Sequence, residues 1–587
     1  MQYTPPIDDL KFGMKYLAGF DEVTSLPAFD HLSLDLAETI IEEAGKLAAE
    51  QIAPLNHDAD MQSAVRLETG EVRTPDGFAD AYKAMAEGGW TAMEASEAYG
   101  GQQMPMLVSA AVNEIWQSSS LSFALCHLLT QGQIFALEQS ASEQQKQTFI
   151  PPMVEGRWTG TMNLTEPQAG TDLAAIKTRA VKQGDHYLIT GQKIYITYGE
   201  HDMAENIVHL VLARTADAPP GVKGISVFIV PKILVNDDGS LGEANDVKCL
   251  SIEKKLGIKA SPTAVLQYGE NGGAIGYLVG EENQGLEIMF GMMNHARFAV
   301  GLQGLAISER AYQQAVDYAQ NRIQGTPLEG EKGQSISHHP DVLRLLAVMR
   351  AEIEAMRAVA LYCGTALDKA HYASAAEEAG SADARASLLV PVVKGWLTER
   401  SVALTSDAVQ VHGGMGFIEE TGAAQHFRDA RILPIYEGTT AIQANDLIFR
   451  KTLRDQGENI KALFAEIIAD MQGSDTAIAQ DVTQAVHCAE EVLECLLAKA
   501  NRPRQAAAGG VNWLMLLGYL VGGWQMVRAY EAAEKAADDF SAPFLSAKKV
   551  TAQIYITHCL PHIQRLAAAI VAEDDPVLAM DTGWLAR

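Results

Sequence analysis

The spacing of apolar residues predicts helices through the first 155 residues. Between residues 33 and 55, apolar side chains recur at helical intervals, beginning at a serine that can cap a helix and ending near a proline. The same spacing runs through residues 106–140, whose second half has almost no charge, so we expect a largely buried helix there. Residues 1–155 are therefore predicted to form an N-terminal helical domain.

The pattern changes after residue 155. From His186 to Gly269, short runs rich in β-branched and aromatic residues are separated by turns rich in Gly, Pro and Asn. These runs do not alternate with helical stretches, which favours an antiparallel sheet over βαβ units. We predict a central antiparallel β domain over residues 156–285.

Helical spacing returns in residues 286–455 and continues through an acidic tail, residues 456–587. The most apolar stretch of the tail, Val511–Val527, contains two amides and three glycines and is short for a membrane span. A buried helix is the favoured interpretation. The expected fold is mostly α with a central antiparallel β domain and an additional C-terminal helical domain.

The net charge of the chain argues against two classes of function, nucleic-acid binding and binding to anionic membranes. The 587 residues carry a formal net charge of −29, and the tail after residue 450 has 12 Lys+Arg against 17 Asp+Glu. Nucleic acid and anionic membranes are poor partners for such a chain, although local groups could still hold an anionic ligand. We therefore expect no nucleic-acid partner and no membrane partner.

Cysteine and histidine spacing gives no sign of a metal site. The six cysteines lie far apart without a C-x-x-C, which is typical of reduced, buried thiols. His338 and His339 lie in a predicted loop, and no H-E-x-x-H occurs. The first residues lack a basic segment followed by an apolar run, so we expect no signal peptide and a cytoplasmic location.

Two glycine-containing segments have open interpretations. In the segment TMNLTEPQAGTDL (residues 161–173), Thr171 or Asp172 could cap the next short helix. Alternatively, the loop could hold a polar planar or phosphate-bearing ligand. The residues alone favour capping. QVHGGMGF, residues 410–417, lacks the third glycine of a dinucleotide-binding loop and follows a helical pattern. Its paired glycines indicate close approach of another chain or a cofactor.

Glu437 is the only charged residue between Arg431 and Asp446, and it stands between Tyr436 and Gly438. Apolar surroundings would strip its hydration and raise its pKa into the range of a general base. An exposed Glu-Gly turn is the alternative, and the residues alone leave the two balanced. Arg297 lies in a predicted helix with few charges. It could form a structural ion pair or serve as a functional cation, and the residues alone do not decide between these two interpretations.

In their order along the chain, these motifs resemble the FAD-dependent acyl-CoA dehydrogenase family over roughly residues 36–450. The series comprises TMNLTEPQAGTDL, TGQKIYITYG, KLGIKASPT, GEENQGL, MMNHARFAVGLQG, DYAQNR and the long segment from KGWLTERSVAL to YEGTTAIQ. The tail resembles that of long bacterial members near the 3-(methylthio)propionyl-CoA dehydrogenases. The resemblance implies an α/β/α three-domain arrangement in a bacterial homodimer or dimer of dimers.

The resemblance also implies where FAD binds, between the β domain and the second helical domain. The ring would be contacted by residues of three segments, Met162, Leu164, Thr165, Tyr195, Ile196, Thr197 and Thr439. The pyrophosphate and adenosine of a neighbouring subunit's FAD would be reached by Arg322, Gln410, Gly413 and Gly414. Pro340 replaces a residue that is commonly Gln, which weakens any FAD role for the adjacent histidines.

Glu437 matches the family's catalytic base, and Gly438 would leave room for substrate. Thr171, Asn294 and Arg297 match positions near the CoA portion. The implied reaction is α,β-dehydrogenation of an acyl-CoA to the trans-2-enoyl-CoA. The base removes the α-proton while a hydride leaves to the flavin, and the backbone N–H of Glu437 with a ribityl hydroxyl stabilises the thioester oxygen. Electrons would pass to an electron-transfer flavoprotein, and no permanent ion pair should hold the base.

The acyl group stays open between 3-(methylthio)propionyl-CoA and the medium or long straight-chain acyl-CoAs of fatty-acid β-oxidation. An acyl-CoA oxidase, which would differ only in oxygen access to reduced flavin, fits the same motifs. A low-activity DNA-associated relative with a long tail fits them too, although the acidic balance of this tail opposes DNA binding.

Overall fold

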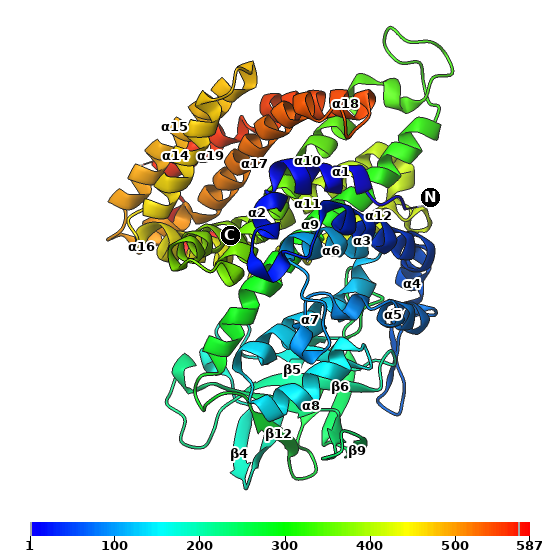
Figure 1. Ribbon diagram of the computed structural model, residues 1–587, viewed down its shortest axis with the longest axis vertical. Coiled ribbons are helices and arrows are strands. Elements are labelled where there is room, and N and C mark those ends of the chain that lie inside the picture. Colours follow the sequence, from blue (N-terminus) through cyan, green and yellow to red (C-terminus); the bar gives the residue numbers. More distant parts are fainter. Residues whose placement is uncertain (1–2, 573–575, 587) are drawn as a thin grey trace.

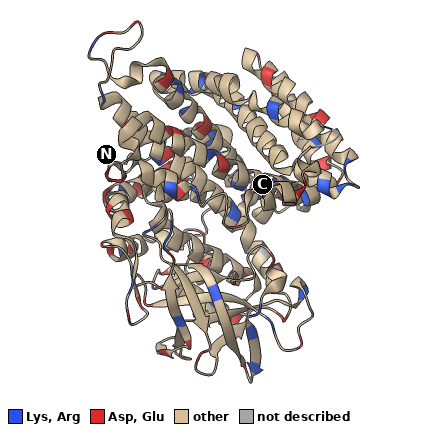
Figure 2. Ribbon diagram, turned by 180° about the vertical axis from the view of Figure 1, so that it is seen from behind, with Lys and Arg blue, Asp and Glu red and all other residues tan. Residues whose placement is uncertain are grey.

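The computed structural model describes residues 3–572 and 576–586. Figure 1 shows the strands gathered at one end of the molecule, with long helices stacked on them and the last helices at the other end. In Figure 2, seen from behind, acidic and basic residues are interspersed over the helical part.

The N-terminal part is helical, as predicted. Its main helices are α3 (Leu34–Leu47), α4 (Asn56–Gln62), α5 (Phe78–Glu87), α6 (Met106–Ser119), α7 (Leu121–Ser140) and α8 (Glu143–Val154). The Ser33 hydroxyl accepts a hydrogen bond from the Leu36 N–H and so caps α3. Most of α7 is buried against the sheet, which confirms the expectation from its lack of charge.

The central sheet has the order β10-β11-β5-β12-β7-β6-β3, with β4 paired to β5. Its strands are β3 (Trp158–Asn163), β4 (Arg179–Gln183), β5 (His186–Thr197), β6 (Asn206–Ala213), β7 (Ser226–Pro231), β10 (Val247–Ile252), β11 (Thr263–Tyr268) and β12 (Ala274–Leu278). The antiparallel prediction is confirmed with one exception, because β3 runs parallel to β6. The intervening β4–β5 hairpin provides the long connection that a parallel pair requires.

Three long helices follow the sheet: α9 (Gly285–Asn321), α10 (Pro340–Tyr372) and α11 (Ala376–His412). Glycines let α9 and α11 approach closely. A Cβ on Gly301 would lie 2.5 Å from Val393 Cγ1, and one on Gly304 would lie 2.7 Å from the Leu397 carbonyl oxygen. This contact places the middle of α11 directly against α9.

The C-terminal helices form a further layer on α10 and α11, consisting mainly of α14 (Glu458–Gln472), α15 (Ala477–Ala498), α17 (Gly510–Lys535), α18 (Ala542–Ile554) and α19 (His562–Val571). The apolar stretch Val511–Val527 lies within α17 and is mostly buried, as predicted. In the part of the chain that the structure describes, no helix is long and apolar enough to cross a membrane.

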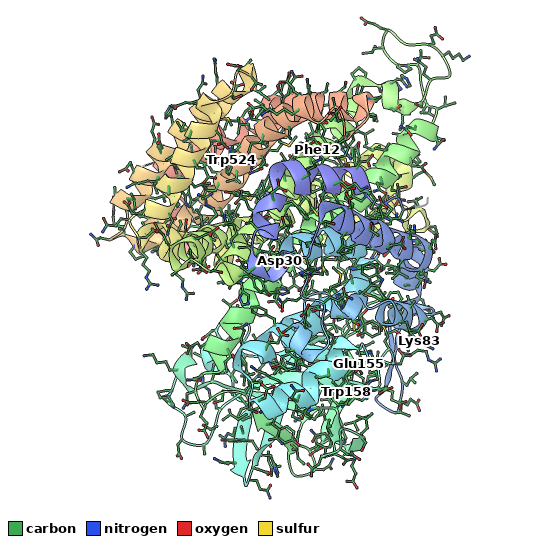
Figure 3. The ribbon with its side chains drawn as sticks, in the orientation of Figure 1. Phe12, Asp30, Lys83, Glu155, Trp158 and Trp524 are labelled. Atoms are coloured by element: carbon green, nitrogen blue, oxygen red, sulfur yellow. The ribbon has the colours of Figure 1, made fainter. Side chains whose placement is uncertain are left out.

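The first helix, α1 (Ile7–Phe12), packs against the C-terminal layer, although it begins the predicted N-terminal domain. Its Phe12 ring lies edge-on to Phe540 and Phe544, at 5.7 and 5.9 Å between centroids. Asp9 is buried and pairs with Arg350 of α10 and Lys548 of α18. Figure 3 shows Phe12 in the helical half of the molecule, well separated from Trp158 in the sheet.

Candidate active site

Glu437 lies in the loop between α12 (Ala423–Ala430) and α13 (Thr440–Asn445). Both Glu437 (φ 54°) and Gly438 (φ 87°) have left-handed backbone conformations. A glutamate in that region costs about 1–2 kcal/mol, so other contacts must hold the turn. The backbone N–H of Glu437 donates no hydrogen bond within the described chain, which leaves it available to a ligand.

Hydrogen bonds from two buried side chains hold this turn. Lys394 Nζ donates to the carbonyl oxygens of Leu433 (2.9 Å) and Gly438 (2.7 Å). Gln443 Nε2 donates to the carbonyl oxygens of Glu437 (3.1 Å) and Gly438 (3.2 Å). The unusual conformation of Glu437 is thus imposed by its surroundings.

The charges around Glu437 differ from the sequence expectation. Burial raises the pKa of its carboxyl above the ordinary value, while nearby Arg297 and Lys394 act in the opposite direction. No ion pair or hydrogen bond to the carboxylate is found among the residues described. The apolar surroundings expected from the sequence are incomplete, because two cations distant in sequence fold close enough to lower the pKa.

Arg297 is buried in α9, and its Nη1 lies 3.8 Å from Asp446 Oδ2. That contact is long for an ion pair, and Arg297 Nε has no hydrogen-bond partner within the described chain. Asn294 lies one turn earlier on the same helix and is exposed. The two residues are neighbours on the surface of α9, and Arg297 lies near enough to Glu437 to influence its pKa.

The segment that begins at β3 lies beside α9. Met162 packs against Leu128 and Leu129 of α7 and against Ala299 of α9, while Leu164 and Thr165 are half-buried. This segment therefore lies against α9, the helix that also carries Arg297.

A buried ion pair fixes the loop after β3. Lys193 Nζ donates to the Leu164 carbonyl oxygen (3.0 Å) and to Glu166 Oε1 (2.8 Å). Farther along, Asp172 accepts a hydrogen bond from the Ala174 N–H, which confirms the capping interpretation for this residue. Thr171 is exposed, and its side chain makes no hydrogen bond within the described chain.

Tyr195 is the most unusual residue of β5. Its backbone is left-handed (φ 61°) and its side chain is 61% exposed. A strained, exposed tyrosine at a sheet surface fits a ligand-facing role. Ile196 is buried in the sheet core, so only its backbone can serve a ligand, and Thr197 pairs with Thr263 of β11.

The residues predicted to reach a neighbouring subunit's FAD form a separate group. Tyr318 stacks on His412 at 4.5 Å between ring centroids, which brings the C-terminal ends of α9 and α11 together with Arg322, Gln410, Gly413 and Gly414. From Arg297 to Arg322 the α9 axis extends about 37 Å. The two predicted groups of residues are therefore far apart within one chain. Space around both glycines is open, since a Cβ on either would meet no atom within 4 Å.

Other predicted residues have local roles. The Thr439 hydroxyl caps α13 by accepting from the Ile442 N–H, and Thr440 donates to Glu399. His339 Nε2 lies 2.9 Å from the Gln324 carbonyl oxygen, and Pro340 begins α10. Among the described residues, no group of three or more potential ligands is placed to hold a metal ion.

Sequence reasoning missed Lys394, Gln443 and Lys193. Lys394 did carry a signal, since it is a single cation in the apolar helical run VPVVKGWL. A lysine in such a run is buried and must find acceptors.

Models of known protein families match most of the chain. Those described as the acyl-CoA dehydrogenase N-terminal, middle and C-terminal domains match residues 35–157, 161–270 and 283–451, and one described as acetyl-CoA dehydrogenase C-terminal like matches residues 460–581. The 3-methylmercaptopropionyl-CoA dehydrogenase of Ruegeria pomeroyi is 47% identical, over 98% of this chain and 99% of that protein.

Two solved structures are also similar. An acyl-CoA dehydrogenase from Bacillus anthracis complexed with FAD has a TM-score of 0.75 at 21% identity, covering 97% of this chain and 93% of that one. A chain from a structure of the electron transferring flavoprotein of Acidaminococcus fermentans has a TM-score of 0.56 at 27% identity, covering 71% of this chain and 97% of that one. The chain belongs to the FAD-dependent acyl-CoA dehydrogenase family, with an additional C-terminal helical domain.

Proposed function

We propose that this acyl-CoA dehydrogenase oxidises a short acyl-CoA, 3-(methylthio)propionyl-CoA, with Glu437 as the base, and passes the electrons to an electron-transfer flavoprotein. The observation that carries the base assignment is the geometry of the Glu437 turn. Its carboxylate is free of ion pairs and hydrogen bonds within the described chain, and its own N–H is unused. A base and an oxyanion donor thus come from one residue.

Each residue has a defined part in the reaction. Glu437 accepts the α-proton, and the raised pKa of its half-buried carboxyl increases its proton affinity. Its N–H donates to the thioester oxygen as negative charge develops there. The missing Cβ at Gly438 does not open space for substrate as expected from the sequence, because a Cβ there would meet Ile442 and the buried Gln443; it instead allows Gln443 to hold the turn. Arg297 with Asn294 would hold the CoA portion.

The residues present fit FAD. Tyr195 offers an exposed aromatic face, Met162 and Thr165 are half-buried beside α9, and the space at Gly413 and Gly414 is open. When bound, FAD supplies the hydride acceptor for the β-hydrogen. Because the two predicted groups of residues are far apart within one chain, a homodimer is proposed in which each subunit completes the cofactor site of the other.

The substrate proposal rests on the 47% identity to the R. pomeroyi enzyme over nearly the whole of both chains. A panel of acyl-CoAs from about C4 to C16, together with 3-(methylthio)propionyl-CoA, would rank kcat/KM. Highest kcat/KM for a long straight-chain acyl-CoA would refute the proposed substrate without touching the proposed base.

The base is tested with Glu437→Gln. This variant should keep bound FAD, and its rate of flavin bleaching by substrate should fall about 10²–10⁴-fold, which is the typical contribution of general-base catalysis. Glu399→Gln is the matched control, because Glu399 is a neighbouring acid that only accepts from Thr440. Bleaching at near wild-type rate in Glu437→Gln would refute the base assignment.

The electron acceptor needs its own experiment. The enzyme would be reduced anaerobically with substrate and then mixed with either electron-transfer flavoprotein or air-saturated buffer. Rapid reoxidation by the flavoprotein and slow reoxidation by oxygen are expected. Fast peroxide formation would instead establish an oxidase.

A further inference from the structure

Lys394 is a buried cation whose side chain reaches the proposed base loop from another helix. It is 0% exposed and lies in the middle of α11, between Val393 and Leu397, the residues that contact the α9 glycines. A buried ammonium requires several acceptors to offset its lost hydration. All its hydrogen bonds within the described chain go to the Glu437 loop.

These hydrogen bonds bracket the loop. The acceptors are the carbonyl oxygens of Leu433, four residues before the base, and of Gly438, immediately after it. One ammonium therefore joins the two ends of the turn that contains Tyr436 and Glu437. Together with the hydrogen bonds from Gln443, these contacts hold the segment that has the left-handed residues.

The charges facing Lys394 come from three elements. They are Glu437 in the loop, Arg297 on α9 and Glu399 on α11 itself. Burial lowers the pKa of Lys394 to about 8, against the opposing effect of Glu437. Lys394 in turn favours the ionised form of Glu437 without forming an ion pair with it among the described contacts. The carboxylate lone pairs thus stay free for a proton.

We propose that Lys394 is a positioning residue for the dehydrogenation. Its ammonium ties the two ends of the loop so that the carboxylate and N–H of Glu437 point to the same substrate, and its charge keeps the base ionised. This inference rests on the proposed role of Glu437. The Lys394 ammonium donates its hydrogen bonds to backbone carbonyl oxygens, so the carboxylate of Glu437 does not have to accept them.

A purely structural role is the alternative, and the chain contains a matched example. Lys499 is also buried, and its Nζ donates to the carbonyl oxygens of Ile570 (2.6 Å) and Ala572 (3.4 Å) in the C-terminal domain. If Lys394 only fills a turn, then Lys394→Met and Lys499→Met should both lower thermal stability and leave the catalytic pH profile unchanged.

The experiment compares these variants as full-length holoenzymes. For Lys394→Met we expect kcat to fall about 30–100-fold with KM within about threefold, because a base displaced by about 1 Å loses roughly that much rate. The acid limb of kcat/KM should move up by about one pH unit. Removing a neighbouring cation raises the pKa of the base, so a higher pH is needed to ionise it. Lys499→Met should show neither change.

Lys394→Gln separates the two parts of the proposal. Its amide can still donate to the loop carbonyls but has no charge, so it should recover part of kcat and keep the shifted acid limb. If the acid limb of kcat/KM in Lys394→Gln lies at the wild-type pH, the proposed role of the charge is wrong. This test also applies if Lys394→Met does not fold. Wild-type kcat in Lys394→Met would overturn the positioning role.

Glu437→Gln distinguishes the two levels of inference. If Glu437→Gln is inactive while Lys394→Met and Lys394→Gln behave as wild type, the proposed role of Lys394 is wrong and the base assignment stands. If Glu437→Gln stays active, the base assignment is wrong, and so is the role of Lys394 that depends on it.

Discussion

Replacing Gly438 with alanine would strain the loop that carries Glu437. The backbone there has φ 87°, and a Cβ would lie 2.8 Å from Gln443 Nε2 and 3.2 Å from Ile442 Cγ2. Gln443 is fully buried and donates to the carbonyl oxygens of both Glu437 and Gly438. Its amide cannot turn towards solvent, so relief of the clash must displace the loop or break these hydrogen bonds.

The magnitude follows from these contacts. Left-handed alanine costs about 1–2 kcal/mol relative to glycine, and loss of two hydrogen bonds adds about 1 kcal/mol each. The sum is about 3–4 kcal/mol. Since each 1.36 kcal/mol corresponds to a factor of ten in rate, kcat/KM should fall about 150–900-fold. The loop can relieve the strain by moving, so we expect most of the loss in activity and little in the unfolding temperature.

Stopped-flow bleaching of the flavin by substrate measures this loss directly. Gly239→Ala is the matched control, because Gly239 has φ 82° and no atom would lie within 4 Å of the new Cβ. It isolates the conformational cost in a turn remote from the base, and its bleaching rate should match wild type. If Gly438→Ala also bleaches at the wild-type rate, the loop tolerates displacement and the positioning argument fails.

Three further predictions follow from the site. Lys193→Met should weaken FAD retention, because it leaves Glu166 buried without its cation and frees the loop after β3. In the wild type, the pKa of Glu166 is lowered to about 2, so this carboxylate stabilises the fold fully above about pH 4.5 and loses its contribution towards pH 2. Acid unfolding followed by fluorescence would measure that loss. Phe417→Ser should dissociate the dimer and release FAD, because Phe417 is 83% exposed beside the open glycines; unchanged elution in size-exclusion chromatography would contradict this. The rate of substrate bleaching should fall as the pH decreases through the raised pKa of Glu437, and an acid limb no higher than that of an ordinary glutamate would contradict burial as its cause.

Local patterns in the sequence predicted much of the fold. The α3 cap at Ser33 and the burial of α7 depend on residues within one or two turns, so spacing and composition were sufficient to predict them. The parallel pairing of β3 was not predictable in this way, because strand direction depends on the long connection through β4 and β5. The docking of α1 on α18 likewise depends on residues at opposite ends of the chain.

The site was predicted in part for the same reason. The isolation of Glu437 in the sequence did not indicate its surroundings, because Arg297 and Lys394 approach it from two other helices. Left-handed backbone at Glu437 and Tyr195 was also missed, since neither residue type favours that conformation. The glycines of residues 413–414 were recognised, but only the fold shows that they lie at the far end of α9 and α11 from the base.

The buried contacts of Asp9 constrain when the chain can finish folding during its synthesis. Its partner Lys548 is 539 positions later in the sequence. At about 5–20 residues per second, a ribosome needs roughly 30–110 s to cover that interval. Throughout that time α1 has neither its second cation nor the aromatic partners of Phe12 on the C-terminal layer. Helix α1 can contact α3 and α10 early, but its docking is complete only after the C-terminal layer has been made.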